Sequence, residues 1–143
     1  MRIEPLKDLE VLRRFLARAG DSLKTFRYFN HRPVTAVSAH LCTMIGLDGD
    51  TPVSYGHLDV EDGVVWLGIC VAEPEKGKGY GDLMMDALLE YRGEISLGVD
   101  ADNISAQKLY EKKGFRYIKT DRGLKFYVIR EREDNVSGDP VVF

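Results

Sequence analysis

Several features that define other classes of protein are scarce or absent in this chain of 143 residues. Its two cysteines, Cys42 and Cys70, both fall in apolar segments, and neither has a CxxC partner or a histidine at metal-ligand spacing. We therefore expect two reduced core thiols, no disulfide framework and no metal. No apolar run is as long as a membrane span, and the first residues lack a signal-peptide core. These absences favour a cytoplasmic protein without a membrane partner.

Positive charge is also in short supply. The formal net charge is −3, and no basic stripe emerges along the chain, so we expect no nucleic-acid partner. With 44% hydrophobic and 30% charged residues, the composition is that of an ordinary folded protein. The length suits a single domain, which we place at residues 1–130. Residues 131–143 show no periodicity and are expected to form a C-terminal tail.

The most informative stretch begins with an unbroken apolar run, Val64–Val71, which predicts a strand buried on both faces. A glycine-rich loop follows, and a strongly periodic helix starts at Tyr80. Helix N-termini carry unpaired N–H groups and partial positive charge, so this order of elements favours an anion site. Glycines 77, 79 and 81 are expected to allow positive φ and to keep side chains out of the ligand's way. A glycine-rich turn that only caps the helix is the plainer alternative.

Two common nucleotide-binding fingerprints do not fit this loop. A Walker loop would need Lys and then Ser or Thr after its last glycine, and Asp82 follows Gly81 instead. A Rossmann fingerprint would need its third glycine at the position of Asp82. A nucleotide-binding protein of another kind that shares a glycine loop stays as a remote alternative.

The segment Lys76-Gly-Lys-Gly-Tyr-Gly81 resembles the acetyl-CoA pyrophosphate loop of the GNAT N-acetyltransferase superfamily. Gly79 and Gly81 match the family's glycines, whereas Lys76 holds the place of a Gln or Arg and lacks the planar fork of arginine. Downstream, Asn103-Ile-Ser-Ala-Gln-Lys-Leu-Tyr-Glu-Lys-Lys-Gly-Phe115 is similar to a second segment of the same superfamily. The two segments and the strands around them cover about the latter two-thirds of the chain.

The periodicities together predict an α/β fold with a mixed sheet: antiparallel N-terminal strands, a central parallel pair joined by a crossover helix, and a C-terminal hairpin. In the GNAT fold, the parallel strands splay apart and the pantetheine arm inserts between them. Gly68 is the predicted bulge that opens them. The expected strands are Met1–Pro5, about Ala36–Leu47, Pro52–Val60, Val64–Val71, Ile95–Val99, Phe115–Thr120 and Leu124–Ile129. The expected helices run from Leu6 to about Ala19, from Asp21 or Ser22 through Tyr28, from Tyr80, and from about Asn103 to Gly114.

The resemblance implies acetyl-CoA as co-substrate and supplies most of the predicted site. Tyr110 matches the superfamily's general acid; its alternative is a core tyrosine with a satisfied hydroxyl. Asn103 is a helix cap, a cofactor contact, or both. Backbone N–H groups of the buried strand would polarise the acetyl carbonyl. The predicted cofactor residues are Ile69, Val71, Lys76, Gly77, Lys78, Gly79, Tyr80, Gly81 and Asn103.

The general base is the part of the site that the sequence leaves open, because Val64–Val71 holds no carboxylate. His57 is our first candidate, since a neutral imidazole can accept a proton at physiological pH. His40, Asp59 or a water chain are the alternatives, and each side chain also has a structural interpretation within its strand. Glu61 and Asp62 are interpreted as turn residues.

The acceptor is expected to be the primary amine of a small molecule, because a short acidic chain has little surface for reading a polymer. An amino sugar of pKa near ~8 is about 10% neutral at pH 7 and asks less of a base than an alkylamine does. The segment Phe26-Arg-Tyr-Phe29 also resembles segments of GNAT enzymes that act on nucleotide-linked amino sugars, although plain core packing explains it too. A protein or peptide amine and a non-catalytic acyl-CoA sensor are the alternatives. Homodimers are common in the superfamily, and these residues do not decide the matter.

Overall fold

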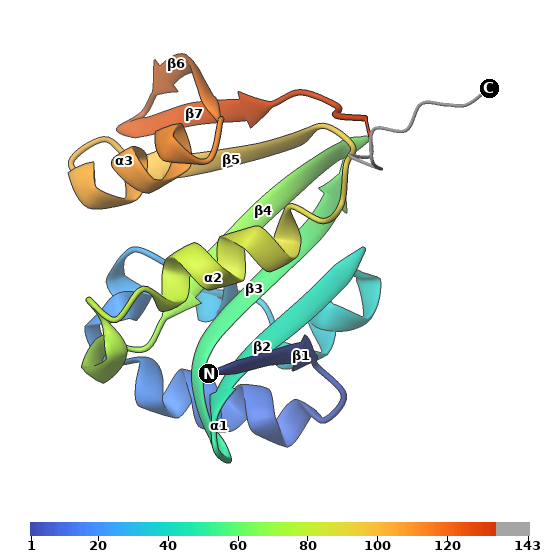
Figure 1. The fold of residues 1–143 in the computed structure, drawn as a ribbon, viewed down its shortest axis with the longest axis vertical. Coiled ribbons are helices and arrows are strands. Elements are labelled where there is room, and N and C mark those ends of the chain that lie inside the picture. Colours follow the sequence, from blue (N-terminus) through green and yellow to red (C-terminus); the bar gives the residue numbers. More distant parts are fainter. Residues whose placement is uncertain (134–143) are drawn as a thin grey trace.

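The computed structural model describes residues 1–133, which form a single seven-stranded mixed sheet with helices on both faces (Figure 1). The strand order is β1-β2-β3-β4-β5-β7-β6. The strands are β1 (Arg2–Pro5), β2 (Cys42–Asp48), β3 (Thr51–Glu61), β4 (Val64–Val71), β5 (Ile95–Asp100), β6 (Arg116–Asp121) and β7 (Leu124–Ile129). The helices are α1 (Leu9–Ala19), α2 (Tyr80–Leu88) and α3 (Ile104–Lys112), with 3₁₀ turns η1 (Gly20–Lys24), η2 (Tyr28–Asn30), η3 (Val34–Ala39) and η4 (Glu73–Glu75).

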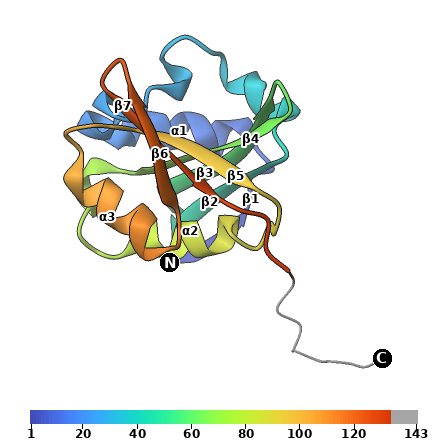
Figure 2. The ribbon, with the colours of Figure 1, turned by 90° about the horizontal axis from the view of Figure 1, so that it is seen from above.

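The sheet separates two hydrophobic cores. Figure 2 shows α1 on one face and α2 with α3 on the other. On the α1 face, Leu12 and Phe15 pack with Tyr55 of β3. On the opposite face, Met84 and Leu88 of α2 belong to the larger core. This core also contains residues of β4, β5 and β7, so it joins the two halves of the sheet.

Helix α1 begins three residues later than predicted. Asp8 is its N-cap, with the carboxylate accepting from the N–H of Glu10 at 2.9 Å. Leu6 still belongs to the sheet edge, because its N–H donates to the carbonyl of Thr43 at 2.9 Å. Gly20, with φ of +63°, ends the helix as expected. The predicted start at Leu6 was therefore wrong, since the β1–β2 pairing continues past Pro5.

The segment between α1 and β2 is the part of the fold that the sequence predicted least well. The second helix is not continuous, and only the short turns η1 and η2 form. The predicted strand from Ala36 does not start until Cys42, because Val34–Ala39 forms η3 behind Pro33. Val34 and Val37 pack against the α1 core, which gives this apolar run a burial site without a strand partner. This placement brings η2 and His40 beside β3.

Strands β3 and β4 pair in one uninterrupted antiparallel register from Ser54↔Val71 to Glu61↔Val64. The tight turn consists of Asp62 and Gly63, both with positive φ. Glu61 is therefore the last residue of β3, and its assignment to the turn was wrong. The predicted bulge at Gly68 is wrong as well, because Gly68 pairs regularly with His57.

The predicted parallel pairing of β4 with β5 is confirmed, but the two strands share few backbone hydrogen bonds. Within residues 1–133, the pairing of β4 with β5 consists of the single bridge Trp66↔Ser96, and the two strands diverge from there in Figure 1. Helix α2 makes the connection between them, as predicted. The β6–β7 hairpin is also confirmed. The part of the predicted tail from residue 134 onward lies outside the described residues.

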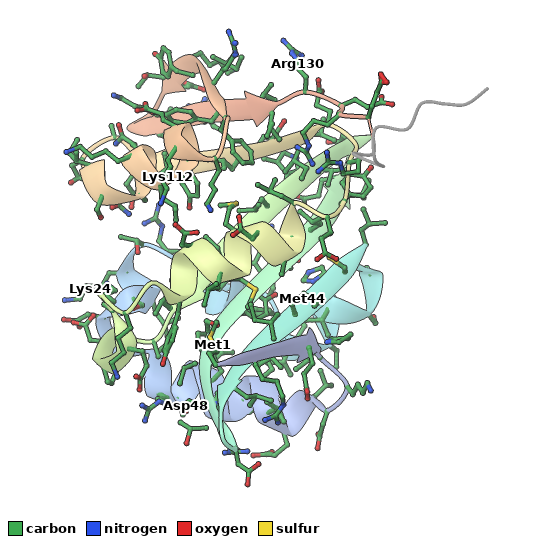
Figure 3. All side chains as sticks on the ribbon, viewed as in Figure 1. Met1, Lys24, Met44, Asp48, Lys112 and Arg130 are labelled. Carbon is green, nitrogen blue, oxygen red and sulfur yellow. The ribbon has the colours of Figure 1, made fainter. Side chains whose placement is uncertain are left out.

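Charge pairs tie the two helices that flank this opening. Lys112 of α3, labelled in Figure 3, donates to Asp82 in the first turn of α2 at 2.8 Å. Lys113 binds Asp82 and Asp86, and its own side chain is largely buried. Both helices are short, and none of those in the described part of the chain has the length and apolar character needed to cross a bilayer.

Candidate active site

A cavity of about 710 Å³ runs from the glycine loop, past the diverging strands, to the aromatic segment before β2. Its wall brings together nearly all of the residues that the sequence singled out. The predicted residues that line it are His57, Ile69, Val71, Lys76, Gly77, Gly79, Tyr80, Gly81, Asn103 and Tyr110. Lys78 is the predicted residue that does not line it.

The glycine loop leaves the N-terminus of α2 open. Gly77 and Gly79 have φ of +84° and +83°, and a Cβ added at either would meet no atom within 4 Å. Gly79 is the N-cap residue and offers no side chain to the helix. Gly81 differs from the prediction, because it lies inside α2 and has no positive φ. The first N–H groups of α2 thus face the cavity unobstructed, as anion binding requires.

The lysines of the loop are held by acidic neighbours three residues earlier. Lys76 lies 3.3 Å from Glu73, and Lys78 lies 2.8 Å from Glu75. Glu75 is buried and also binds Arg18 of α1. The hydrogen bonds from Lys78 and Arg18 lower the pKa of Glu75, so it is a carboxylate at neutral pH. Glu75 therefore anchors the loop to α1 and offsets much of its positive charge.

Two backbone amides of β4 point into the gap between the parallel strands. Ala72 donates to Val53 across the β3–β4 ladder at 2.9 Å, and hydrogen bonding alternates along an antiparallel strand. The N–H groups of Ile69 and Val71 consequently face away from β3, beyond the Trp66 bridge to β5. The carbonyl of Val71 is already bonded to the buried hydroxyl of Ser22 at 2.6 Å. The opened edge of β4 thus presents donors to the cavity.

Tyr110 is held in α3 with its ring against Phe115 and only 8% of its surface exposed. Burial raises its pKa to about 12, so the phenol is protonated at neutral pH. Among residues 1–133, no side chain or backbone group bonds its hydroxyl. Proton transfer to a thiolate of pKa near ~8.5 is uphill by about 5 kcal/mol in the unliganded site. Tyr110 is therefore a hydrogen-bond donor that faces the cavity in this state.

Asn103 is a helix cap that also faces the cavity. Its side-chain oxygen accepts from the N–H of Ala106 at 3.3 Å at the start of α3. The neighbouring Gln107 is buried and donates to the carbonyls of Asp100 and Ala101. These bonds fix the turn between β5 and α3, and so the position of Tyr110 two helical turns later.

His57 lies at the other end of the cavity, and the residue is 3% exposed. The hydroxyl of Tyr55 lies 2.6 Å from Nδ1. The ring covers Gly68, where an added Cβ would lie 2.5 Å from Nε2. Burial, with smaller contributions from His40 and Arg32, lowers the pKa of His57 to about 3, so the imidazole is neutral at physiological pH. A base this weak is poorly suited to take a proton from an amine.

Asp59 lies two residues further along β3, so its side chain shares the face of His57. It is 8% exposed and lines the cavity. The hydroxyl of Tyr28 donates to it at 2.8 Å and is itself 2.8 Å from Nε2 of His40. On its other side, His40 lies 2.9 Å from the hydroxyl of Thr43. Asp59 is thus a buried carboxylate oriented by a chain of hydrogen bonds.

Positively and negatively charged side chains lie around the end of the cavity that contains His57 and Asp59. The Arg32 guanidinium lies 4.1 Å from the centre of the Tyr28 ring and 3.8 Å from Glu61. Arg27 makes a two-pronged ion pair with Asp100, which lowers the pKa of that carboxyl. Arg27 is therefore held by an ion pair, whereas Arg32 donates to the carbonyl of Tyr28 at 3.1 Å and meets Glu61 more loosely.

Glu61, Arg32 and Ser22 line the cavity, and the sequence analysis did not predict them as site residues. A signal for Glu61 was present, because Tyr55, His57, Asp59 and Glu61 occupy every second position of one strand and must share a face. The contacts of Arg32 and Ser22 join segments that are far apart in the sequence, and no local pattern reveals them.

A splayed parallel pair beside an open helix N-terminus, with a tyrosine and polar groups around one cavity, defines an acyltransferase of mixed α/β type. Residues 6–115 match the acetyltransferase (GNAT) family, and the chain belongs to that family. A search of curated proteins found no match.

Solved structures agree in fold over nearly the whole chain. A putative acetyltransferase, yncA, from Salmonella typhimurium, solved with its cofactor acetyl-CoA, is similar with a TM-score of 0.73 at 14% identity, over 98% of each chain. An IAA acetyltransferase from Bacillus cereus gives 0.70 at 17% identity, over 92% of this chain and 99% of the other. The ribosomal-protein-S18-alanine N-acetyltransferase of Escherichia coli gives 0.66 at 18%, over 94% and 97%. At such identities the likeness concerns the fold.

Proposed function

We propose that this protein transfers the acetyl group of acetyl-CoA to the primary amine of a small molecule. The observation that carries the proposal is the single cavity that joins an open helix N-terminus, unpaired strand amides, Tyr110 and a buried carboxylate. Each of these groups would serve one step of acetyl transfer, and their presence around one cavity supports the proposal.

Acetyl-CoA would lie along the glycine loop and the gap between β4 and β5. The diphosphate would accept from the first N–H groups of α2 at Gly79, Tyr80 and Gly81, where no side chain intervenes. The pantetheine arm would run between the strands, with its amides near Val71 and Asn103. The acetyl carbonyl would accept from the N–H of Ile69, which stabilises negative charge on oxygen.

The acceptor side supplies the base. Asp59 would take a proton from the incoming ammonium, directly or through water, and the neutral amine would then attack the thioester carbon. The new C–N bond forms as the carbonyl electrons move to oxygen. On collapse, the C–S bond breaks with its electron pair on sulfur, and Tyr110 gives its proton to the thiolate. The second nitrogen proton leaves to solvent, Asp59 releases the first proton to solvent, and solvent returns a proton to Tyr110, so that one proton is released per turnover.

An amino sugar, or a nucleotide-linked amino sugar, is the acceptor that we favour. Phe26, Tyr28 and Trp66 give the acceptor end an aromatic wall suited to the apolar face of a ring. Arg32 stands beside it with donors for an anionic group. A weakly basic amine was preferred because it asks less of a general base. The buried Asp59 weakens that reason, because it supplies a carboxylate base in the cavity wall. A protein amine is the rival acceptor, and the Escherichia coli neighbour acts on a ribosomal protein by its name.

Calorimetric titration with acetyl-CoA, free CoA and ATP tests the cofactor. We expect micromolar binding of acetyl-CoA that is lost in Gly79→Glu, because the new side chain would occupy the approach to α2. A panel of amino sugars, nucleotide-linked amino sugars, polyamines and peptides, assayed by thiol release, then tests the acceptor. Faster turnover of polyamines or peptides than of any amino sugar would refute our choice of acceptor. Binding without turnover of any amine, in wild type and in Tyr110→Phe alike, would support an acyl-CoA sensor instead.

A further inference from the structure

The surroundings of His57 suit a role other than that of a base. We propose that His57 donates a hydrogen bond from Nε2 to the oxygen of the reacting acetyl group, and that Tyr55 is the positioning residue that sets its tautomer. This inference rests on the proposed function, because it concerns the same transfer step.

The tautomer follows from the hydrogen bond between the two side chains. Tyr55 is completely buried, and burial raises its pKa far above the usual value, so its hydroxyl keeps the proton. Within residues 1–133, the acceptor that the structure offers to this hydroxyl is Nδ1 of His57, at 2.6 Å. An Nδ1 that accepts a hydrogen bond carries no proton, so the proton of the neutral ring is on Nε2.

The free nitrogen lies where the acetyl oxygen is expected. Nε2 would be 2.5 Å from a Cβ on Gly68, and Gly68 directly precedes Ile69, whose amide faces the gap. Standard bond lengths then place Nε2 no more than about 6.5 Å from the Ile69 nitrogen. Two donors no more than about 6 Å apart, a separation that this bound allows, can both approach one oxygen to about 3 Å, the distance that oxyanion stabilisation needs.

The environment also holds the ring in place. Its centroid is 4.4 Å from those of both Tyr28 and His40, and 5.4 Å from that of Tyr55. A donor fixed before the reaction needs no reorganisation when charge develops on the oxygen. In this arrangement no proton leaves His57 during the reaction, and Asp59 alone serves as the base on β3.

The tautomer can be measured directly by ¹⁵N NMR of the histidine rings in the full-length chain at pH 7, with and without CoA. The chain has three histidines, so His31→Gln and His57→Gln assign the resonances. We expect His57 to show an unprotonated Nδ1 and a protonated Nε2, and to lose this preference in Tyr55→Phe. A proton on Nδ1, or on both nitrogens, would overturn the proposal.

Kinetics test the role itself. Loss of one oxyanion donor typically costs about 10²–10³ in kcat, so we expect a loss of that size in His57→Ala, with an unchanged KM for acetyl-CoA. His57→Gln keeps an N–H donor and should recover about tenfold of this loss. His31→Gln, an exposed residue outside the cavity, should match wild type. Activity of His57→Ala within twofold of wild type would overturn the inference while the proposed function stands. An inactive wild type would overturn the proposed function itself, whereas the NMR result would still establish the state of the ring.

Discussion

Adding one methyl group at Gly68 should disturb both stability and activity. In Gly68→Ala the new Cβ would lie 2.5, 2.7 and 3.1 Å from the Nε2, Cε1 and Cδ2 atoms of His57. Normal contact between such atoms is about 3.5 Å, so the ring must retreat by about 1 Å. Its aromatic neighbours, Tyr28 and His40, leave it little room.

Overpacking of this kind typically costs about 1–3 kcal/mol, and a catalytic group misplaced by about 1 Å can cost about 10²-fold in rate. We therefore expect Gly68→Ala to lose about 2 kcal/mol of unfolding free energy in urea and about 10²-fold in kcat. If the clash with His57 is the cause, the stability cost should fall below about 0.5 kcal/mol when the same change is made in His57→Ala.

Gly98→Ala is the matched control. Gly98 is another strand glycine in the wall of the same cavity, and the three atoms nearest to its added Cβ, the first at 3.2 Å, all belong to Phe126. Its stability cost should be the same with and without the His57 ring. Equal costs of Gly68→Ala in the two backgrounds would refute the assignment of Gly68 as the residue that makes room for the histidine.

Three further changes test other parts of the site. Ser22→Ala removes the hydroxyl that bonds the carbonyl of the half-buried Val71 at 2.6 Å, and loss of this hydrogen bond should cost about 1 kcal/mol in urea unfolding; an unchanged midpoint would contradict this. Tyr110→Phe should lower kcat by at least about 10²-fold, the usual contribution of a general acid, while calorimetry shows unchanged acetyl-CoA binding. His57 has a folded-state pKa lowered to about 3, against ~6.5 in the unfolded chain. Protons therefore bind the unfolded state preferentially between these values, and wild type should lose stability as pH falls through this window. Urea unfolding measured at pH 7 and at pH 4.5 should show that His57→Gln loses less unfolding free energy than wild type between these two values. The difference should be as much as about 1.4 kcal/mol per pH unit.

The features predicted well from the sequence are those determined by a few residues that are adjacent in the chain. The strand Val64–Val71 and the helix from Tyr80 follow from their local apolar patterns, and Gly77 and Gly79 have the expected positive φ. Gly81 does not, and the expectation that the strand is buried on both faces was wrong, because most of its residues are half-buried. The capping residue Asn103 and the two strands of the C-terminal hairpin belong to the same group.

The features that failed depend on distant partners. Val34–Ala39 has the composition of a strand, yet its valines pack on α1, and no strand is placed to pair with it. The hydrogen bond from Tyr28 to Asp59 joins residues 31 positions apart. Gly68 was interpreted from its own conformation, whereas its function depends on the ring across the ladder. Such contacts are set by packing and register, which a single sequence does not display.

Because β4 and β5 share a single bridge, the stability of the folded chain should depend on what is bound between them. A sheet normally closes with backbone bonds along its whole length, and here the hydrophobic core around α2 must hold the two halves together across the seam. A ligand bound in the seam would supply the missing bonds and would stabilise the folded chain in proportion to its concentration. At 100 times its dissociation constant it would add about 2.7 kcal/mol, a large part of the stability of a typical domain. We therefore expect resistance to proteolysis to rise with the concentration of acetyl-CoA if that ligand binds in the seam.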